Sequence, residues 1–325
     1  MFRPSFLSPD KNFYYLKKRV MEVLLKALQS VLQIFHSNPT ELEVFYHSLP
    51  TGPRHAEQLQ LGTVSVAASH PELVRYCDCY PQDSHLCPTS SGAGFLNASL
   101  VELSKRRKSR YIAAAGPMAP EWYGTDTRAA FWSAVWANHV RVIVALAVPQ
   151  KGVQGCAEYT NAREYRSVGL RVEPIIERDG ISLSTRERIM RLTHAESGCQ
   201  RNITQVEFQQ WPNYGVPNAA SMVAQLALRV EHLQRQDEVD AGAGGESSAP
   251  LLVHCAGGVG RTGTFLTLLS LWEDREELIS PDALFRAVVE RVAALRRQRH
   301  PYCVESAAQF GLIFSALREM ALLSK

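Results

Sequence analysis

The stretch from residue 251 to residue 263 constrains the fold of this chain more than any other part. It reads Leu-Leu-Val-His-Cys-Ala-Gly-Gly-Val-Gly-Arg-Thr-Gly, an apolar run that ends in a cysteine, followed by small residues and an arginine. The apolar run predicts a buried strand, and the pattern that begins at Thr264 predicts a helix. Gly257, Gly258 and Gly260 permit backbone conformations that a Cβ would forbid, so successive N–H groups can turn inward. The sequence therefore predicts a strand–loop–helix unit with an anion site at the helix N-terminus.

Two reactive side chains flank this loop. Cys255 would lie inside the anion site, where the same dipoles lower the pKa of a thiol. Arg261 can present a planar fork to two oxygens of a phosphate. A buried structural cysteine is the alternative interpretation, and a Walker-type loop is excluded because no Gly-Lys-Ser/Thr follows the glycines. The spacing of cysteine, five residues, arginine and Thr-Gly favours a nucleophilic thiolate in a phosphate site.

The composition is that of an ordinary globular protein, with 46% hydrophobic and 21% charged residues among 325. This length suits one large α/β domain or two small ones. A net charge of +3 is too small to indicate nucleic-acid binding. The seven cysteines do not suggest a disulfide framework, and a nucleophilic thiol needs a reducing compartment, so we expect a cytoplasmic protein. We expect no secretory signal and no membrane span, because the most apolar early run, Val20–Phe35, is short and contains charges.

Residues 1–39 predict a helical extension. Asn12–Phe35 carries an apolar stripe at helical spacing, formed by Leu16, Val20, Val23, Leu24, Ala27, Leu28, Val31 and Phe35. We expect this helix to pack on the domain; a partner-binding or membrane-surface helix is the alternative. Thr40 with Glu43 forms a predicted capping box for a second helix that runs to Leu49.

Further periodic segments predict the elements of one α/β domain. A continuous apolar run at Val140–Val148 is typical of a buried central strand, and alternating patterns at Leu170–Pro174 and Arg201–Phe208 predict two more strands. Helices are predicted at Ser221–Leu233, at Pro281–Gln298 and at the C-terminus. The Gly/Ser-rich residues 240–249 predict a flexible surface insertion.

Two other clusters favour plain structural interpretations. The basic run Lys105–Arg110 predicts a solvated hairpin; attraction of acidic peptides or a targeting signal is the alternative. Cys77, Cys79, His85 and Cys87 could suggest a metal cluster, but Cys-x-Cys within a loop is not the paired spacing of zinc ligands. We therefore predict no metal site.

Several motifs, in one order, resemble the tyrosine-specific, cysteine-dependent protein tyrosine phosphatases. The phosphate loop resembles that family's pattern of His-Cys, five residues, Arg and Ser/Thr-Gly. Arg75–Asp83 with Gly94–Ser99 is similar to its phosphotyrosine-recognition loop. Further similar segments are Tyr111–Met118, Phe131–Trp136, Gly155–Tyr159, Gln210–Pro217 and His300–Phe310. The resemblance covers about residues 41–320.

The resemblance implies an α/β (α+β) fold, with a single domain at residues 40–325 whose central, highly twisted mixed β-sheet is flanked by helices. It implies phosphoryl transfer in two steps, with Cys255 as the nucleophile and a cysteinyl-phosphate intermediate. The groups that would hold the phosphoryl oxygens are Ala256, Gly257, Gly258, Val259, Gly260 and Arg261. His254 would orient the loop and help to keep the thiol ionised, and Thr262 would hydrogen-bond the sulfur as it leaves. No cofactor or metal is implied, because the loop N–H groups and Arg261 supply the positive charge.

The resemblance also assigns substrate contacts. Tyr76 would stack on the phenyl ring of phosphotyrosine, and Asp78 would accept N–H groups of the peptide backbone. Such an aromatic wall makes the pocket deep, so a phosphoserine could not reach its floor. The implied partners are proteins or peptides that contain phosphotyrosine, with phosphate or other oxyanions in the same pocket.

Several positions depart from the family pattern. Asn213 stands where an aspartic acid of the mobile loop protonates the departing tyrosine oxygen, and an amide cannot transfer a proton at neutral pH. Gly155 stands where a lysine normally pairs with that aspartate. Glu305 stands where a glutamine positions the hydrolytic water, and Gln309 is the second glutamine of that segment. Tyr302, near a family glycine, is expected to crowd the pocket mouth. One such change could be an introduced substitution, but their clustering favours natural divergence.

Two hypotheses of different classes follow. General acid catalysis is worth about 10²- to 10⁴-fold, so the favoured hypothesis is a phosphatase with slow turnover, in which Glu305 could supply proton transfer or water activation. The alternative is a catalytically dead pseudophosphatase that binds phosphotyrosine and captures phosphoproteins. The Tyr76 loop and the Trp-Pro-x-x-Gly-Val-Pro segment disfavour a dual-specificity or lipid phosphatase.

Overall fold

One mixed β-sheet forms the centre of the computed structural model, which describes residues 9–52, 55–90, 92–104, 110–152, 155–180, 184–240 and 249–325. Its eight strands lie in the order β1-β2-β8-β3-β7-β6-β5-β4. They are β1 (Ala98–Glu102), β2 (Arg110–Ala115), β3 (Val142–Ala145), β4 (Arg163–Tyr165), β5 (Leu170–Asp179), β6 (Thr185–His194), β7 (Gln200–Phe208) and β8 (Leu251–Cys255). The neighbours β2, β8, β3 and β7 run parallel, and the remaining pairs are antiparallel. The predicted α/β class with a mixed central sheet is confirmed.

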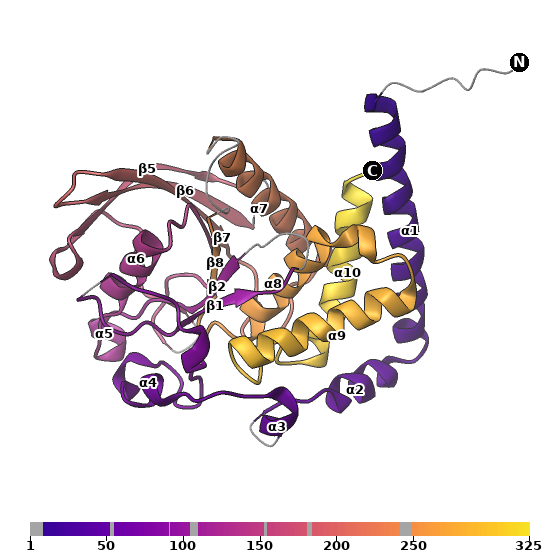
Figure 1. Ribbon diagram of the computed structural model, residues 1–325, viewed down its shortest axis with the longest axis horizontal. Helices are drawn as coiled ribbons and strands as arrows, with labels where there is room; N and C mark the ends of the chain where they lie inside the picture. The colour runs from indigo at the N-terminus through magenta and orange to yellow at the C-terminus, as the bar shows by residue number, and fades with distance from the viewer. Residues whose placement is uncertain are drawn as a thin grey trace, which may run out of the picture.

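Helices cover both faces of this sheet, as the unbroken apolar sequences of its central strands require. Leu251 and Val253 of β8 pack into one hydrophobic cluster, and Leu252 packs into the other. The first cluster contains α1 (Pro9–Ser37), α2 (Pro39–Ser48), α7 (Ala220–Asp240), α8 (Gly260–Glu273), α9 (Pro281–Gln298) and α10 (Ala307–Leu323), and the second contains α6 (Arg128–Ala137). Alternation of side chains along the strand therefore divides the core between the two faces of the sheet. In Figure 1, α6 lies on one side of the sheet, and α8, α9 and α10 lie on the other.

Short helices complete the chain between these elements. They are α3 (Ala56–Leu59), α4 (Ser65–Ala68) and α5 (Pro120–Tyr123), with 3-10 turns at Pro71–Leu73, Asp83–His85, Arg166–Val168 and Arg275–Glu277. Within the described ranges, none of the helices combines the length and the apolarity that crossing a membrane requires.

The first helix, α1, lies along α10 and also contacts α9 (Figure 1). Leu24 and Leu28 of its predicted apolar stripe are fully buried, whereas Leu16 belongs to the part of α1 whose side chains are not described. The Phe35 ring meets the Phe314 ring edge-on, with 5.5 Å between centroids. The described part of the stripe therefore packs into the largest of the hydrophobic core clusters.

The second helix starts earlier than the capping box predicts. α2 begins at Pro39, and its N-cap residue is Asn38, so the predicted cap at Thr40 is wrong. The Asn38 side chain donates to Glu41 Oε1 at 3.1 Å. Proline suits the first helical position because its missing N–H would have no partner there, and this preference outweighs the Thr40–Glu43 pattern.

The strands differ from the sequence expectations at their ends. β3 covers only Val142–Ala145, and β5 runs on to Asp179, past a β-bulge beside Pro174. A proline at a bulge interrupts the alternation without ending the strand. The polar-rich β6, which pairs with β5 and β7, was not predicted. α7 is longer than expected, and most of the predicted insertion (241–248) and of the basic run (105–109) lies outside the described residues.

Candidate active site

The carboxyl end of β8 brings Cys255 to a tight loop that leads into α8. Gly258 has φ +70°, and a Cβ there would lie 2.3 Å from the Ala114 carbonyl oxygen of β2, so only glycine fits. Behind the loop, the guanidinium of Arg299 donates to the carbonyl oxygens of Gly257 and Gly258, each at 3.1 Å. The Gly258 N–H in turn donates to Cys255 Sγ at 3.2 Å. The loop thus has carbonyl groups on its rear and an N–H group directed at the sulfur.

The environment of Cys255 favours its thiolate. The residue is 3% exposed, and burial alone would raise its pKa. The charge of Arg261, the hydroxyl and N–H groups of Thr262 and the Val259 N–H outweigh burial and hold the thiol pKa below its ordinary value. The Thr262 hydroxyl is buried and no other group in the described structure competes for it, so it remains available to the sulfur. Since the thiolate is the nucleophilic form, the site can present a charged sulfur to a phosphoryl group.

Arg261 joins the first turn of α8 to the loop at residues 211–217. Its Nη1 donates to the carbonyl oxygens of Leu146 at 3.0 Å and Trp211 at 3.2 Å, and its Nη2 donates to Asn213 Oδ1 at 3.0 Å. Because a guanidinium only donates, the Asn213 oxygen must face Arg261 and the amide nitrogen must face away. That nitrogen is buried without a hydrogen-bond partner among the described residues.

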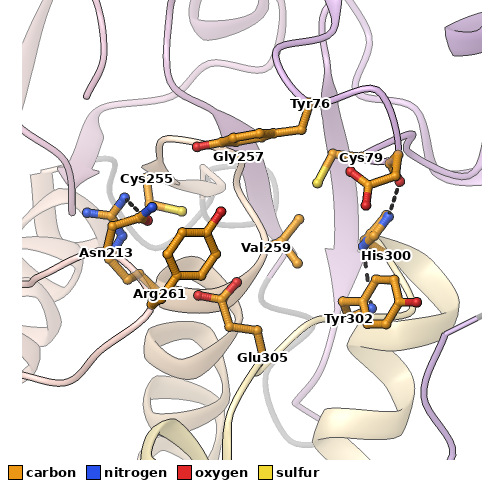
Figure 2. Close-up of a pocket in the computed structure, with 13 residues that line it drawn as sticks. Tyr76, Cys79, Asn213, Cys255, Gly257, Val259, Arg261, His300, Tyr302 and Glu305 are labelled. Atoms are coloured by element: carbon orange, nitrogen blue, oxygen red, sulfur yellow. Dashed lines mark hydrogen bonds between the residues drawn. The ribbon is translucent and has the colours of Figure 1, made fainter. Parts of the chain in front are cut away.

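These side chains enclose a cavity of about 280 Å³ (Figure 2). It is lined by Tyr76, Asp78, Cys79, Asn213, Tyr214, Cys255, Gly257, Val259, Gly260, Arg261, His300, Tyr302 and Glu305. Most of the predicted site residues therefore meet in one place. Those that do not line the cavity are His254, Ala256, Gly258, Thr262 and Gln309.

The mouth of the cavity is aromatic on two sides. The Tyr76 ring covers the phosphate loop, since a Cβ on Gly257 would lie 2.9 Å from it. Tyr302 lies beside His300, away from the sulfur, in Figure 2. It is 41% exposed, and its hydroxyl packs so closely on Gly52 that a Cβ there would lie 2.8 Å away. Tyr302 therefore narrows the rim and not the space above the sulfur.

Asp78 lies at the same rim with its side chain exposed. Its backbone carbonyl oxygen accepts a hydrogen bond from His300 Nε2 at 2.8 Å. This bond fixes the backbone at the rim and leaves the Asp78 carboxylate facing solvent, where it can meet the main chain of a bound peptide.

His254 is a neutral residue behind the loop. Burial lowers the pKa of its imidazole to about 4, so it carries no charge near pH 7. Its Nε2 lies 2.6 Å from the Tyr159 hydroxyl, and its Nδ1 lies 3.3 Å from the Cys255 carbonyl oxygen. His254 therefore supplies no positive charge to the thiol, and its contacts hold the loop in place.

Glu305 places a carboxyl group beside the start of α8. A Cβ on Gly260 would lie 2.2 Å from its carboxyl carbon, and Figure 2 shows the carboxyl directed into the cavity. Gln309 holds it in place, because its Nε2 donates to Glu305 Oε1 at 3.2 Å and its Oε1 accepts the Glu305 N–H at 3.1 Å. Burial raises the pKa of Glu305, although Gln309 and Arg261 oppose the shift. Among the described lining residues, only Asp78 and Glu305 carry a carboxyl group.

Gly155 is packed directly against Gln150. A Cβ at this position would lie 2.3 Å from Gln150 Cγ and 2.5 Å from the Gln150 carbonyl oxygen. A lysine could not occupy position 155 with the backbone as it stands. The packing of Gln150 therefore leaves no room for a basic side chain there.

The cysteines Cys77, Cys79 and Cys87, which precede the first strand, are free thiols. Within the described ranges, no group of three or more potential ligands is arranged to hold a metal ion. Burial raises the thiol pKa of Cys79 and of Cys87 to about 12. Neither sulfur is therefore activated in the way that Cys255 is.

The sequence did not reveal three buried polar residues that support the loop. Arg299 holds its carbonyl groups, and Tyr159 and Gln205 form hydrogen bonds behind His254. Arg299 follows a predicted helix with a basic end, which looks like an ordinary C-terminal charge. Gln205 lies in a strand whose alternation predicts that one face is buried. A polar residue on that buried face was the signal that could have indicated a structural hydrogen bond.

Comparisons with known proteins agree with this geometry. The family model described as protein-tyrosine phosphatase matches residues 70–319. Receptor-type tyrosine-protein phosphatase F of Rattus norvegicus is 29% identical over 233 residues, which cover 71% of this chain and 11% of that protein. Receptor-type tyrosine-protein phosphatase C of Homo sapiens is 30% identical over 253 residues, covering 75% and 18%. Tyrosine-protein phosphatase Lar of Drosophila melanogaster is 30% identical over 230 residues, covering 70% and 10%.

The chain spans less than a fifth of the length of each of these relatives. The family match, in contrast, covers most of the chain and includes the sheet, the phosphate loop and the 211–217 loop. The chain therefore belongs to the protein-tyrosine phosphatase family.

Proposed function

We propose that this protein hydrolyses phosphotyrosine on proteins through a cysteinyl-phosphate intermediate, with slow turnover because Asn213 replaces the proton donor. The lowered thiol pKa of the fully buried Cys255, beside Arg261 in a lined cavity, is the observation that carries the proposal. The family supplies the reaction class, and the cavity supplies the oxyanion site.

In the first step, the Cys255 sulfur forms a bond to phosphorus while the bond from phosphorus to the tyrosine oxygen breaks. Arg261 and the N–H groups of residues 256–260 hold the three equatorial oxygens. The departing oxygen then needs a proton, and the Asn213 amide can only donate a hydrogen bond to it. In the second step, water attacks phosphorus and the sulfur leaves as the thiolate, which Thr262 stabilises.

Glu305 is the group that we propose as the proton carrier in both steps. It would give its proton to the departing oxygen and then take one from the attacking water. Both oxygens lie opposite the sulfur in an in-line transfer, so one carboxyl can serve both. Two observations support this role: the pKa of Glu305 is raised, and Gln309 holds its carboxyl group by a hydrogen bond. The other carboxyl group of the lining, that of Asp78, is exposed to solvent at the rim.

The substrate contacts belong to the same proposal. Tyr76 stacks on the substrate ring, Asp78 accepts peptide N–H groups and Tyr302 limits the residues beside the phosphotyrosine. We place the catalytic domain at residues 40–325, with 1–39 as a helical extension. The protein would act in the reducing cytoplasm, where a low-pKa thiol remains unoxidised.

A pair of substrates tests the proposal. Nitrophenyl phosphate has a good leaving group that needs little protonation, so the parent should cleave it at least about 10²-fold faster than a phosphotyrosyl peptide. Cys255→Ser should abolish both reactions. Equal rates for both substrates would contradict the role given to Asn213, and phosphate release by Cys255→Ser would contradict the nucleophile.

A pseudophosphatase is the second candidate. The observation that favours it is the hydrogen bond from Arg261 to Asn213, which holds the 211–217 loop at the cavity. The Asn213 side chain that makes this bond has no ionisable proton. Such a protein would bind phosphotyrosyl peptides with equal affinity as parent and as Cys255→Ser, and the parent would release no phosphate. Release of phosphate that requires Cys255 would exclude this candidate.

A further inference from the structure

A continuous buried hydrogen-bond chain links the β6–β7 strand pair to the catalytic loop. Arg188 Nη1 donates to Gln205 Oε1 at 2.9 Å, and Gln205 Nε2 donates to the Tyr159 hydroxyl at 2.7 Å. That hydroxyl lies 2.6 Å from His254 Nε2, and His254 Nδ1 lies 3.3 Å from the Cys255 carbonyl oxygen. The first four side chains are between 0% and 7% exposed, so water does not compete for these bonds.

The two ends of this chain agree on the direction of every bond, because Arg188 can only donate and the Cys255 carbonyl oxygen can only accept. A guanidinium has only donors, so Gln205 must turn its oxygen toward Arg188 and its NH₂ toward Tyr159. The Tyr159 oxygen accepts that bond, which leaves its O–H to donate to His254 Nε2. A neutral imidazole then carries its one proton on Nδ1, from which it donates to the Cys255 carbonyl oxygen. His254 is neutral here because burial lowers its pKa to about 4.

We propose that Arg188 and Gln205 are positioning residues for the catalytic cysteine, because they hold Tyr159 as a donor to His254 Nε2 and so support the His254 tautomer protonated at Nδ1. Neither residue lines the cavity. They act through Tyr159 and His254 on the peptide group that follows the nucleophile.

The opposite tautomer would disturb the loop. It would place the bare Nδ1 lone pair against the Cys255 carbonyl oxygen, so that two buried acceptors face each other. The carbonyl would then rotate away, and the N–H groups that follow it would lose their alignment on the sulfur. The proton on Nδ1 therefore helps to hold the loop in the form that stabilises a thiolate.

Arg188 is itself fixed by acidic partners. Its Nη1 also lies 3.0 Å from Glu207 Oε2, and its Nε lies 3.1 Å from Glu177 Oε2. The guanidinium is thus held at both ends, and Glu177 is 55% exposed at the surface. Arg188 therefore anchors this hydrogen-bond chain in an ion-pair cluster on β5, β6 and β7, and the three residues of that cluster do not line the cavity.

Nitrogen NMR of protein labelled at histidine tests the inference, because it reports which ring nitrogen carries the proton. A His254→Gln variant identifies the His254 signals among the ten histidines. The parent should show protonated Nδ1 and bare Nε2, whether or not it turns over phosphotyrosine. The reverse assignment in the parent would overturn the inference outright.

Three variants test whether Gln205 and Arg188 influence the tautomer of His254. Gln205→Glu places a carboxylate, held ionised by Arg188, against Tyr159; the Tyr159 O–H must then donate to it, and the His254 proton should move to Nε2. Gln205→Met is the control for loss of the side chain: it adds no acceptor, so Tyr159 can still donate to His254, the Cys255 carbonyl oxygen still accepts from Nδ1, and the parent tautomer should persist. Arg188→Lys keeps a donor-only cation and should also keep the parent tautomer. An unchanged tautomer in Gln205→Glu, or a changed one in Arg188→Lys, would contradict the proposed order.

Alkylation of Cys255 by iodoacetamide, followed on its peptide by mass spectrometry, measures the consequence. Below the ordinary thiol pKa, Gln205→Glu should react about tenfold more slowly than Gln205→Met. The two variants differ in charge only by the carboxylate that Gln205→Glu introduces, which is paired with Arg188; the charged groups nearest the thiol, Arg261 and Arg299, are the same in both, as are Cys79 and Glu305 across the cavity. Equal rates in the two variants, with reversed tautomers, would show that the tautomer does not influence the sulfur.

Discussion

Arg261 Nη2 and Asn213 Oδ1 lie 3.0 Å apart, so an amide oxygen occupies the place at which a carboxylate would form an ion pair with the phosphate-binding arginine. The amide preserves the hydrogen bond and therefore the position of the 211–217 loop. It has no proton to give at neutral pH. In the proposed reaction, the same contact therefore retains the geometry for phosphate binding but supplies no proton donor.

An aspartic acid at position 213 should increase the turnover rate. Asn213→Asp should raise kcat for a phosphotyrosyl peptide by about 10²-fold or more, since general acid catalysis is typically worth that much. The rate with nitrophenyl phosphate should change far less. Asn218→Asp, an exposed neighbour in sequence, is the matched control and should leave both rates near those of the parent. An equal gain with both substrates would mean that leaving-group protonation is not the missing step.

Removing the carboxyl group of Glu305 should slow the reaction further. Glu305→Gln keeps the size of the side chain and its bond to Gln309 but cannot carry a proton. We expect residual turnover to fall at least about tenfold and the pH profile of kcat to lose the limb set by this carboxyl. Asp78→Asn should raise KM for peptides without this change in the profile. A profile that survives Glu305→Gln would exclude Glu305 as the proton carrier.

The same substitution should change stability in a pH-dependent way. Burial raises the pKa of Glu305, so between the unfolded and folded pKa values the folded protein binds more protons. Stability contributed by the neutral carboxyl is therefore present below the unfolded pKa and is lost as pH rises through the folded pKa. The Tm of Glu305→Gln relative to the parent should be higher at pH 7 than at pH 4. A Tm difference that does not vary with pH would contradict the burial described above.

The first helix should unfold together with the rest of the domain. Leu28 on α1 is 0% exposed in the larger core cluster, so Leu28→Ala should lower the free energy of unfolding by about 2–5 kcal/mol in a urea titration. Gln29→Ala, at an exposed neighbouring position, should change it by less than about 0.5 kcal/mol. Equal small effects would show that α1 is an independent appendage.

The sequence was most informative where local chemistry alone decides the structure. The apolar run at Leu251–Val253 and the glycines after Cys255 predict the strand, loop and helix start that the structure has. Pro281–Gln298 is helical over the predicted range, since Ser280 caps its start and Pro281 occupies the first turn. The shape of the candidate site followed from these short patterns together with the family resemblance.

Long-range contacts decided the rest. β6 is rich in charged residues and lacks a strong alternating pattern, yet it pairs along its whole length with β5 and β7. Asn38, and not Thr40, is the N-cap residue of α2, because Pro39 favours the earlier start of the helix. The neutral state of His254 depends on burial by residues distant in sequence, such as Tyr159, and no local pattern could reveal it.

The tight packing of Gly155 on Gln150 has a consequence for anyone who wants a fast enzyme from this scaffold. A lysine cannot be reintroduced there by one codon change, because its first side-chain carbon would collide with the neighbouring main chain. Position 150 and the turn that carries it have to be rebuilt at the same time. In the proposed mechanism, Asn213→Asp alone would give an acid without a basic residue at position 155, and adding that residue requires rebuilding both segments together.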